Sequence, residues 1–587
     1  MTVMESRRGT SLIDLIMALG ILALLFSGIY LVYFSVLDAI VNVELRASAS
    51  SVLNQEIEVI RNLPYGSVGT VGGIPAGLIP AEQSVPYGTR TFFITTTVRN
   101  IDDPFDGTLG GSPNDTSPAD YKLISLEVSC PTCQRFVPLF FTTTVSPKNL
   151  ESAGSDGSIF INVFNADGVG VPGASVHIMN ASVTPSIDLT DVTNASGVLQ
   201  LVGVPTSTQS YSLEISKENY SRDQTYPLGA PGNPNPLTPH ATVAAGEVTN
   251  VSFAIDRTSQ LTVRTSDYLC APVPSMNFSV AGAKIIGTPD VLKFSTTSAT
   301  GATGTKVFSG FEWDTYGVTL NEAAYDVAGT TPFSPLTINP SSTVDFRFVL
   351  QPADADALLL SVKNAASGVA ISNATITVSR AGFETVVRSG EASVGETNWS
   401  GGAYTAQSGQ VDPDSVPGSV RLLANASGTY PAGPEWLESK TIDLGGSSSV
   451  LQKFSFLGSL PPAAGPDSVT FQLAANNDDM SWNFIGPDGT GGTAYTGTAF
   501  DPIPALDGNR YVRYRVYLKT ADGTVTPTLD SVTLAFSGNC VPPGQAIISG
   551  LLAATYDIQV EAQGYQVATS TASVAGAFQS AQISLSP

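Results

Sequence analysis

The segment LIMALGILALLFSGIYLVYFSVL, residues 15–37, contains 23 residues and no charged side chain. A helix of that length can cross the hydrocarbon core of a bilayer. Arg7 and Arg8 precede it, and the positive-inside bias keeps such an end in the cytoplasm and places the chain after Asp38 outside. The segment is longer than the apolar region of a cleaved secretory signal, and no small-residue cleavage site closes it. We therefore expect a membrane-anchored chain whose bulk is exported.

The helical pattern continues beyond this segment. In DAIVNVELRASASSVLNQEIEVIRN, residues 38–62, apolar side chains recur every three to four positions, and Pro64 follows. The pattern predicts one helix of about 50 residues, roughly 80 Å long at 1.5 Å per residue. Asp14 lies at the cytoplasmic edge of the apolar run, where a carboxylate is costly unless an ionic partner neutralises it. We expect Asp14 to have such a partner.

The stretch RRGTSLIDLIMALGILAL, residues 7–24, resembles the class III signal of type IV prepilins and pseudopilins: a basic leader, a glycine, and an apolar segment with an acid at its fifth position. The resemblance implies that prepilin peptidase cleaves after Gly9 and methylates the new N-terminus at Thr10. Thr10 stands where the family usually has Phe, and Asp14 where it usually has Glu. In a fibre, Asp14 would pair with the α-amino group of Thr10 on a neighbouring subunit and fix the axial register.

The resemblance also implies an order of parts and a set of partners. Residues 1–9 would be the leader, 10–63 the pilin helix with its membrane segment 15–37, and 64–150 a pilin-like β head. The partners would be prepilin peptidase, other pilin subunits and the pilus assembly platform. A single-pass anchor with a helical stalk is the competing interpretation.

Composition limits the remaining functions. The 587 residues include 27 Lys and Arg against 50 Asp and Glu, a net charge of −23, so phosphates would be repelled and nucleic acid is an unsuitable partner. His177 and His240 are the only histidines, and no HExxH, GxSxG or phosphate-binding glycine loop is present. We expect no enzyme activity, cofactor or metal, although a carboxylate pair brought together by the fold would escape this search.

Alternating segments indicate a mainly β fold after the helix. In the head these are RTFFITTTVRNI (90–101), YKLISLEVS (121–129) and FVPLFFTTTVS (136–146), which are typical of an antiparallel sheet. The acidic cluster Asp102, Asp103 and Asp106 between them lacks the spacing of a calcium loop. A solvated turn is the preferred interpretation.

An internal repeat begins near residue 157. Its copies open with INVFNADGVGVPGASVHIMN, LTVRTSDYLCAPVPSMNFSV and LLLSVKNAASGVAISNATITVSR. The copies resemble carboxypeptidase regulatory-like domains, which implies seven-stranded sandwiches that serve as stalks or adhesion modules without catalytic residues. Tyr211, Tyr316 and Tyr556 occupy matching positions, and we expect them in the cores. The predicted copies are 157–256, 257–352 and a split copy formed by 356–397 and 538–587.

Residues 398–537 differ in character and predict an inserted domain, similar to jelly-roll or galactose-binding-like modules. They contain three of the four tryptophans: Trp399, Trp436 and Trp482. A ligand site is predicted near Trp482, Tyr495, Arg510 and Arg513, because aromatic rings stack on sugars and guanidinium groups bind hydroxyls or carboxylates. Ordinary packing is the alternative for these four residues.

The four cysteines of an exported chain should be oxidised, and three pairings are open. Cys130 and Cys133 form CPTC between two predicted strands, where a disulfide is preferred over metal or redox chemistry because no nearby residue completes a zinc site. Cys270 and Cys540 would then pair with each other.

Taken together, these features predict a minor pilin or pseudopilin that assembles through its N-terminal helix and displays adhesive β-sandwich modules. It would pass from the inner, or cytoplasmic, membrane to an extracellular pilus or the cell surface. Two alternatives stay open. One is a membrane-anchored surface protein that binds a glycan without assembling, and the other is a surface hydrolase in the inserted domain.

Overall fold

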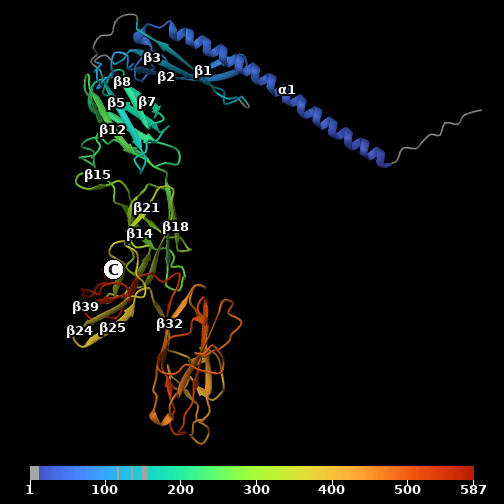
Figure 1. The fold of residues 1–587 in the computed structure, drawn as a ribbon, viewed down its shortest axis with the longest axis vertical. Coiled ribbons are helices and arrows are strands. Elements are labelled where there is room, and N and C mark those ends of the chain that lie inside the picture. Colours follow the sequence, from blue (N-terminus) through green and yellow to red (C-terminus); the bar gives the residue numbers. More distant parts are fainter. Residues whose placement is uncertain (1–11, 116–117, 134–135, 148–155) are drawn as a thin grey trace, which may run out of the picture. The chain divides into compact units, whose positions relative to one another are not determined.

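The computed structural model describes residues 12–115, 118–133, 136–147 and 156–587, and Figure 1 follows their elements by colour. The fold is mainly β with one long N-terminal helix, as expected from the sequence. The chain divides into two compact units: Met1–Arg257 with Ile285–Val291, and Thr258–Lys284 with Leu292–Pro587.

Helix α1 spans Leu12–Arg61, which confirms the predicted single helix of about 50 residues. It ends where Pro64 becomes the N-cap of a short 3-10 helix, η1, at Tyr65–Ser67. Proline fixes φ and cannot donate a backbone hydrogen bond, so the α-helical ladder stops before it. The Glu58 carbonyl in the last turn accepts both the Asn62 backbone amide at 3.2 Å and the Asn62 side-chain amide at 2.7 Å.

The head after the helix is a four-stranded antiparallel sheet in the order β1-β2-β3-β4. The predicted segments 90–101 and 121–129 coincide with β2 and β3, in which alternate residues are buried. The strands are β1 Glu82–Tyr87, β2 Arg90–Ile101, β3 Tyr121–Ser129 and β4 Leu139–Val145.

The first sandwich consists of the sheets β10-β9-β6-β7, with β11 on β9, and β12-β5-β8, around one apolar core. Its first and last strands, β5 and β12, pair in parallel. The strands are β5 Gly157–Phe164, β6 Ser175–Asn180, β7 Ile187–Val192, β8 Val198–Val204, β9 Ser207–Ser216, β10 Asp223–Gln224, β11 Ala241–Val243 and β12 Val248–Ala254.

The second sandwich repeats this plan. Its sheets are β18-β13-β22-β20 and β17-β14-β19-β21, and its first and last strands, β13 and β22, again pair in parallel. The strands are β13 Ser259–Ser266, β14 Asn277–Gly282, β17 Ser295–Ala299, β18 Thr305–Phe311, β19 Asp314–Leu320, β20 Tyr325–Thr331, β21 Leu336–Ile338 and β22 Thr343–Pro352, with a separate two-stranded ribbon of β15 Ile285–Gly287 and β16 Val291–Leu292.

The third sandwich is built from two distant parts of the chain. Its sheets are β38-β23-β41 and β25-β24-β39-β40, and β23 and β41 form the parallel pair. Figure 1 shows β24 and β25 beside the C-terminal strand β39. The strands are β23 Leu358–Asn364, β24 Thr375–Arg380, β25 Phe383–Arg388, β38 Gln545–Ile548, β39 Ala554–Glu561, β40 Ala568–Val574 and β41 Gln579–Leu585.

The inserted module lies between β25 and β38 and has three sheets around its own core: β26-β37-β32-β34, β27-β30-β35-β31 with β33 on β35, and β28-β29-β36. Its elements are β26 Ala392–Glu396, η2 Ser400–Gly402, β27 Tyr404–Gln407, β28 Val411–Asp412, β29 Val420–Leu422, β30 Glu435–Ser439, β31 Ile442–Asp443, β32 Val450–Leu457, η3 Pro462–Ala464, β33 Val469–Asn476, β34 Ala499–Phe500, η4 Pro504–Leu506, β35 Tyr511–Leu518, β36 Thr528–Leu529 and β37 Ser531–Ser537.

One predicted boundary is wrong. The sequence assigned residues 356–397 to the third sandwich, yet β26 pairs with β37 along its whole length, from Ala392–Phe536 to Glu396–Val532. Residues 392–396 therefore belong to the inserted module. Only residues 389–391 separate β25 from β26, and β26 alternates in the same way as β25, so the pattern does not show that the chain changes sheet.

Candidate assembly site: helix α1 and its sheet

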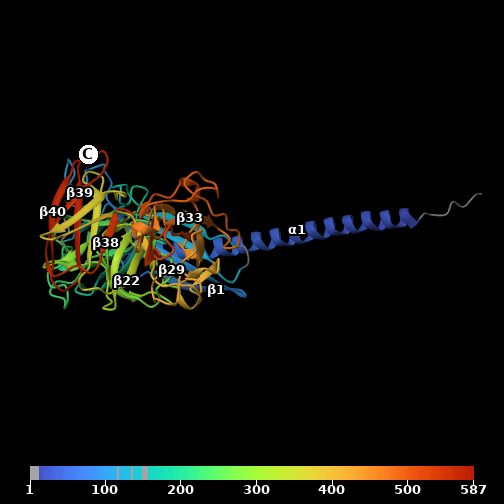
Figure 2. The ribbon, with the colours of Figure 1, turned by 90° about the horizontal axis from the view of Figure 1, so that it is seen from below.

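The N-terminal half of α1 exposes its apolar side chains. Ile16 is 61% exposed and Val43 is 69% exposed, with large apolar residues exposed along the helix between them. The helix contains an 18-residue window of mean hydropathy 2.2 with no buried residue, which makes it long and apolar enough to cross a membrane. In Figure 2 this half of α1 extends away from β1 of its own head. Such a surface is stable only in a bilayer or against other apolar helices.

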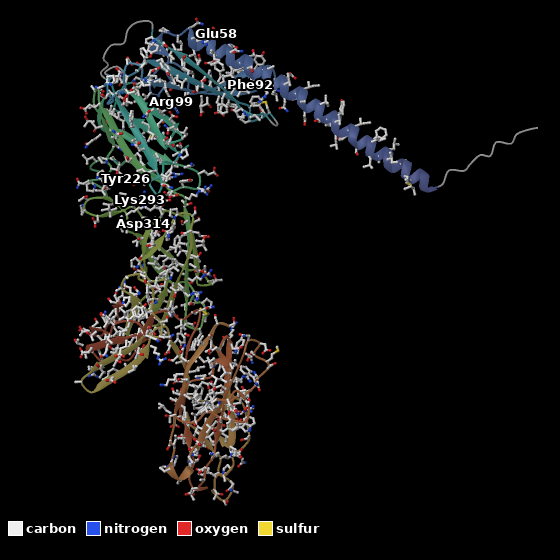
Figure 3. The ribbon with its side chains drawn as sticks, viewed as in Figure 1. Glu58, Phe92, Arg99, Tyr226, Lys293 and Asp314 are labelled. Atoms are coloured by element: carbon white, nitrogen blue, oxygen red, sulfur yellow. A yellow bond between two sulfur atoms is a disulfide. The ribbon has the colours of Figure 1, made fainter. Side chains whose placement is uncertain are left out.

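The C-terminal half of α1 buries one face. Leu45 is 2% exposed and Ile60 is fully buried, and the other buried positions between them follow the helical spacing of three to four: Ala49, Val52, Leu53 and Ile57. These residues share a core with Phe92 and Ile94 of β2 and with Ile124 and Leu126 of β3. Phe92 on the sheet and Glu58 on the helix are labelled in Figure 3.

This contact anchors the helix to the head. Burying each Leu, Val or Ile side chain contributes about 1.5–3 kcal/mol, so the shared core holds the C-terminal half of α1 on the sheet. The first half is therefore left free to make contacts outside the head.

Lys122 fixes the turn after α1 to the sheet. This buried β3 residue donates through Nζ to the carbonyls of Tyr65 at 2.8 Å and Val68 at 2.6 Å, and Nζ lies 4.5 Å from the centre of the Tyr65 ring. Burial lowers the pKa of Lys122 from 10.5 to about 8. No pattern in the sequence indicates this role, because an isolated lysine in an alternating strand usually faces solvent.

Of the residues predicted to act in processing and assembly, only Asp14 is among the residues that the structure describes. Gly9 and Thr10 lie outside the described residues, and Asp14 lies in the first turn of α1, which begins at Leu12. Peptidase cleavage, methylation and the pairing of Asp14 therefore stay predictions.

Both expected disulfides are present. Cys130 bonds to Cys133 in the turn between β3 and β4, where the Cys133 amide also donates to the Cys130 carbonyl at 3.0 Å. Cys270 bonds to Cys540 across 270 positions of sequence.

The acidic turn of the head forms no cation site in the described part of the chain, where no group of three or more His, Cys, Asp or Glu residues is placed to hold a metal. Asp102 accepts a hydrogen bond from the Leu109 amide at 2.9 Å, and Asp103 accepts one from the Phe105 amide at 3.1 Å. Both carboxylates therefore accept amide hydrogen bonds within this part of the chain.

Three of the four predicted ligand-binding residues already have partners inside the inserted module. The Arg510 guanidinium makes two 2.8 Å hydrogen bonds to Asp443. Arg513 lies 4.2 Å from the Trp482 ring centre and 3.1 Å from a carboxylate oxygen of Glu438. A ligand would have to compete with these contacts, so binding at Trp482, Arg510 and Arg513 stays a prediction.

Tyr495 does not belong with the other three. It is 4% exposed, its ring stacks on Phe500 at 4.2 Å, and its hydroxyl accepts a hydrogen bond from the Ile503 amide at 3.2 Å. It lies in the core, whereas Arg513 belongs to the partly exposed residues that alternate with the core residues of β35. The sequence predicts Tyr495 in a candidate ligand site, and this is corrected: the chain turns back beside Phe471 and buries the ring.

The same module contains a buried polar network that no sequence motif indicates. Trp399 donates through Nε1 to the Tyr514 hydroxyl at 2.7 Å, and that hydroxyl donates to Glu396. Burial raises the pKa of Glu396. Carboxylates with raised pKa values often mark active sites. Here Trp399 and Tyr514 are almost completely buried, and the network links β26, β35 and the segment that precedes η2.

No family model and no curated protein matches this chain. Similar solved structures include GBS52, the minor pilin of Streptococcus agalactiae, at 12% identity, covering 34% of this chain and 96% of that one with a TM-score of 0.18. The shaft pilin SpaA of Lactobacillus rhamnosus GG is similar at 13% identity over 34% of this chain and 98% of that one, with a TM-score of 0.13.

The Bacillus anthracis TIE protein is similar at 12% identity and a TM-score of 0.15, with 53% of this chain aligned, and the chain spans 63% of that protein's length. At these TM-scores the similarities carry no argument about function, which rests on the residues of this chain.

Proposed function

We propose that the protein is a type IV pilin-like subunit, a minor pilin or pseudopilin, that assembles through α1 and displays its β-sandwich modules outside the cell. The observation that carries the proposal is the division of α1 into an exposed apolar half and a half packed on a four-stranded antiparallel sheet. The first half fits a bilayer before assembly and a bundle of equivalent helices afterwards. The second half connects that bundle to the head.

The leader sequence adds an independent reason. Gly9 followed by an apolar stretch with Asp14 at its fifth position supplies both a cleavage site and a charge to pair inside an apolar bundle. The inserted module and the three sandwiches follow the helix in sequence, so they would face outward from the fibre or the cell surface.

The decisive experiment is mass spectrometry of the mature N-terminus. We expect a chain that begins with N-methyl-Thr10 in wild-type cells and an uncleaved chain in Gly9→Leu, because a bulky side chain at the scissile position does not fit the peptidase. An intact Met1 in the wild-type surface protein would refute pilin processing and favour a plain membrane anchor.

A further inference from the structure

Cys270 lies at a position that the other two copies of the repeat fill with glycine. Each sandwich has a tight turn after its first strand, closed by the hydrogen bonds Gly168 N to Asn165 O, Cys270 N to Asp267 O and Gly368 N to Asn364 O. The three donors have φ values of 77°, 65° and 70°. A side chain is unfavourable in this left-handed region, so the second copy tolerates backbone strain at Cys270 that the other copies avoid.

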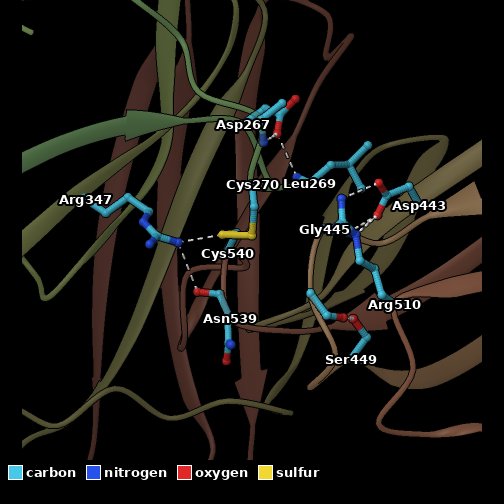
Figure 4. The surroundings of a disulfide bond; sticks show 12 residues. Asp267, Leu269, Cys270, Arg347, Asp443, Gly445, Ser449, Arg510, Asn539 and Cys540 are labelled. Atoms are coloured by element: carbon cyan, nitrogen blue, oxygen red, sulfur yellow. Dashed lines mark hydrogen bonds and ion pairs between the residues drawn. A yellow bond between two sulfur atoms is a disulfide. The ribbon is translucent and has the colours of Figure 1, made fainter. Parts of the chain in front are cut away.

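The turn that carries Cys270 also packs on the inserted module. Tyr268 and Leu269 contact the apolar core of that module. A Cβ atom on Gly445 would lie 2.0 Å from the Leu269 carbonyl oxygen, so only glycine permits the approach. Figure 4 shows the loop around Gly445 held by Asp443, which accepts from the Gly445 amide at 2.9 Å and pairs with Arg510.

Cys540 bonds to Cys270 and so joins the end of the inserted module to this turn of the second sandwich. We call the contact between the turn and the inserted module, with this bond, the junction. Cys540 lies between the last strand of the inserted module, β37, and the first returning strand of the third sandwich, β38. The Arg347 guanidinium of β22 is 2.5 Å from the Cys540 sulfur and 3.4 Å from the Asn539 carbonyl (Figure 4). Nearby, the Gln545 side chain donates to the Thr330 carbonyl at 2.7 Å and accepts from the Thr330 amide at 2.9 Å.

Without the disulfide, a pull on the inserted module would reach the rest of the chain through the third sandwich. The N-terminal end of the module continues into β25, an edge strand whose only sheet neighbour among the described strands is β24. Force applied at that end breaks the hydrogen bonds of the edge strand one after another. Such bonds resist less force than bonds that are loaded together. The disulfide offers a covalent path from the C-terminal end of the module directly to the second sandwich.

We propose that the Cys270–Cys540 disulfide and the turn around it have a mechanical function: they carry tension from the inserted module into the second sandwich and shield the split third sandwich. The proposal deepens the proposed function, because tension arises when a displayed module is held while the helix is anchored. The strained cysteine, the close approach at Gly445 and the contacts of Arg347 and Gln545 all belong to this junction.

The test is single-molecule pulling of the detergent-solubilised full chain, with ligation tags inserted after Phe105 and Met480, which are 96% and 83% exposed. From Cys270 to the second tag the chain itself runs 210 residues, whereas the path through the disulfide and Cys540 runs 60. Removing the bond should therefore lengthen the fully extended molecule by about 150 residues, roughly 500 Å at about 3.5 Å per residue.

The informative variant is Cys270→Gly with Cys540→Ser, because glycine is the residue that the other two copies carry at this turn. We expect its first unfolding step at a lower force than in the wild type and a step from the third sandwich that the wild type does not show. Cys130→Ser with Cys133→Ser is the matched control: it removes the other disulfide, which links no two modules, and should leave the pulling pattern unchanged.

Two results would overturn the proposal. One is an equal final length for the wild type and the Cys270→Gly, Cys540→Ser variant, which would mean that the bond does not form. The other is a first unfolding step at the same force in both, which would mean that the bond does not protect the third sandwich. Neither result bears on N-terminal processing, so pilin assembly is tested separately.

Discussion

Asp14 and Lys122 are charged residues at positions where a charge is costly. The role of Asp14 could be predicted from the sequence, whereas the role of Lys122 could not. Asp14 is conspicuous because it interrupts an apolar run that is long enough to span a bilayer. Lys122 is not conspicuous in the sequence, because the carbonyls that it contacts belong to a turn more than 50 positions away in the chain. The same limit explains Tyr495, whose burial depends on a loop that folds back beside Phe471.

Replacing Asp14 tests the assembly role of its charge. We expect Asp14→Ala to be processed normally but to enter fibres several-fold less, since the neighbouring α-amino group would lose its partner in an apolar environment. Asp14→Glu is the matched control and should assemble at least as well as the wild type. Immunoblots of sheared surface fractions measure this, and wild-type levels of Asp14→Ala in the fibres would contradict the pairing.

Lys122 predicts a pH dependence of the head. Its pKa is about 8 in the folded state and 10.5 in its ordinary state, so between these values the unfolded chain binds more protons. The free energy of unfolding of the head should therefore rise as the pH increases from about 8 to about 10.5. Lys122→Met, which cannot titrate, should lack this rise.

Hydrogen exchange of peptides from β3 and the C-terminal half of α1 measures the effect, with the wild type and Lys122→Met compared at each pH. A constant ratio of their protection factors between pH 7.5 and pH 10 would show that Lys122 titrates normally.

At the scale of elements, matching tyrosines close the three sandwiches in the same way. The hydroxyls of Tyr211, Tyr316 and Tyr556 donate to the carbonyls of Pro205, Glu312 and Leu552 at 2.6, 2.8 and 2.9 Å. Each bond returns to the chain four to six positions upstream, the geometry known as a tyrosine corner. All three rings are buried, which confirms the predicted core role.

The hydroxyl of Tyr556 should contribute measurably to the third sandwich. We expect Tyr556→Phe to destabilise it by about 1 kcal/mol, because the Leu552 carbonyl loses its donor and Arg380 Nε loses an acceptor while the ring stays packed. Hydrogen exchange in β39 should become about five-fold faster and exchange in the other two sandwiches should not change. Tyr511→Phe is the control, since the Tyr511 hydroxyl makes no hydrogen bond within the described chain. Equal exchange rates in β39 for Tyr556→Phe and the wild type would show that the corner adds no stability.

The sequence predicted individual elements better than their pairing. Strands β2 and β3 have the predicted bounds because each has one buried face and a clear turn at both ends. The parallel pairing of β23 with β41 could not be predicted from the sequence, since it joins segments separated by more than 200 positions and depends on the whole sandwich. The strand β26 was placed in the wrong module because alternation fixes the faces of a strand but not its neighbours.

At the scale of the whole molecule, the inserted module occupies a turn that is short in the other two copies. The hydroxyls of Thr193, Thr300 and Ser389 accept a backbone N–H at 2.9, 3.0 and 3.0 Å at the start of this turn. A glycine at positive φ ends it in each copy: Gly197, Gly304 and Gly544. Three residues lie between these positions in the first two copies, whereas residues 390–543 lie between them in the third.

The two ends of the insertion meet within the third sandwich. The Gly390 amide donates to the Gln545 carbonyl at 2.7 Å, and the Gly544 amide donates to the Ser372 hydroxyl at 3.0 Å. Gly544 is also required for the fit, because a Cβ atom there would lie 2.7 Å from the Val362 carbonyl oxygen. A guest whose ends lie this close together can be accommodated in a turn without disturbing the strands on either side.

The module should therefore be removable. Replacing residues 390–543 with Asn-Ala-Ser, the sequence of 194–196, restores the short turn of the first copy, and Cys270→Gly removes the unpaired thiol. We expect the third sandwich of this variant to stay folded, because its core residues all lie outside the replaced segment. Hydrogen exchange of β23 and β41 should remain slow. A longer deletion, 383–543, is the matched control: it also removes β25 and should expose β24. Rapid exchange of β23 and β41 in the first variant would show that the third sandwich depends on its guest for stability.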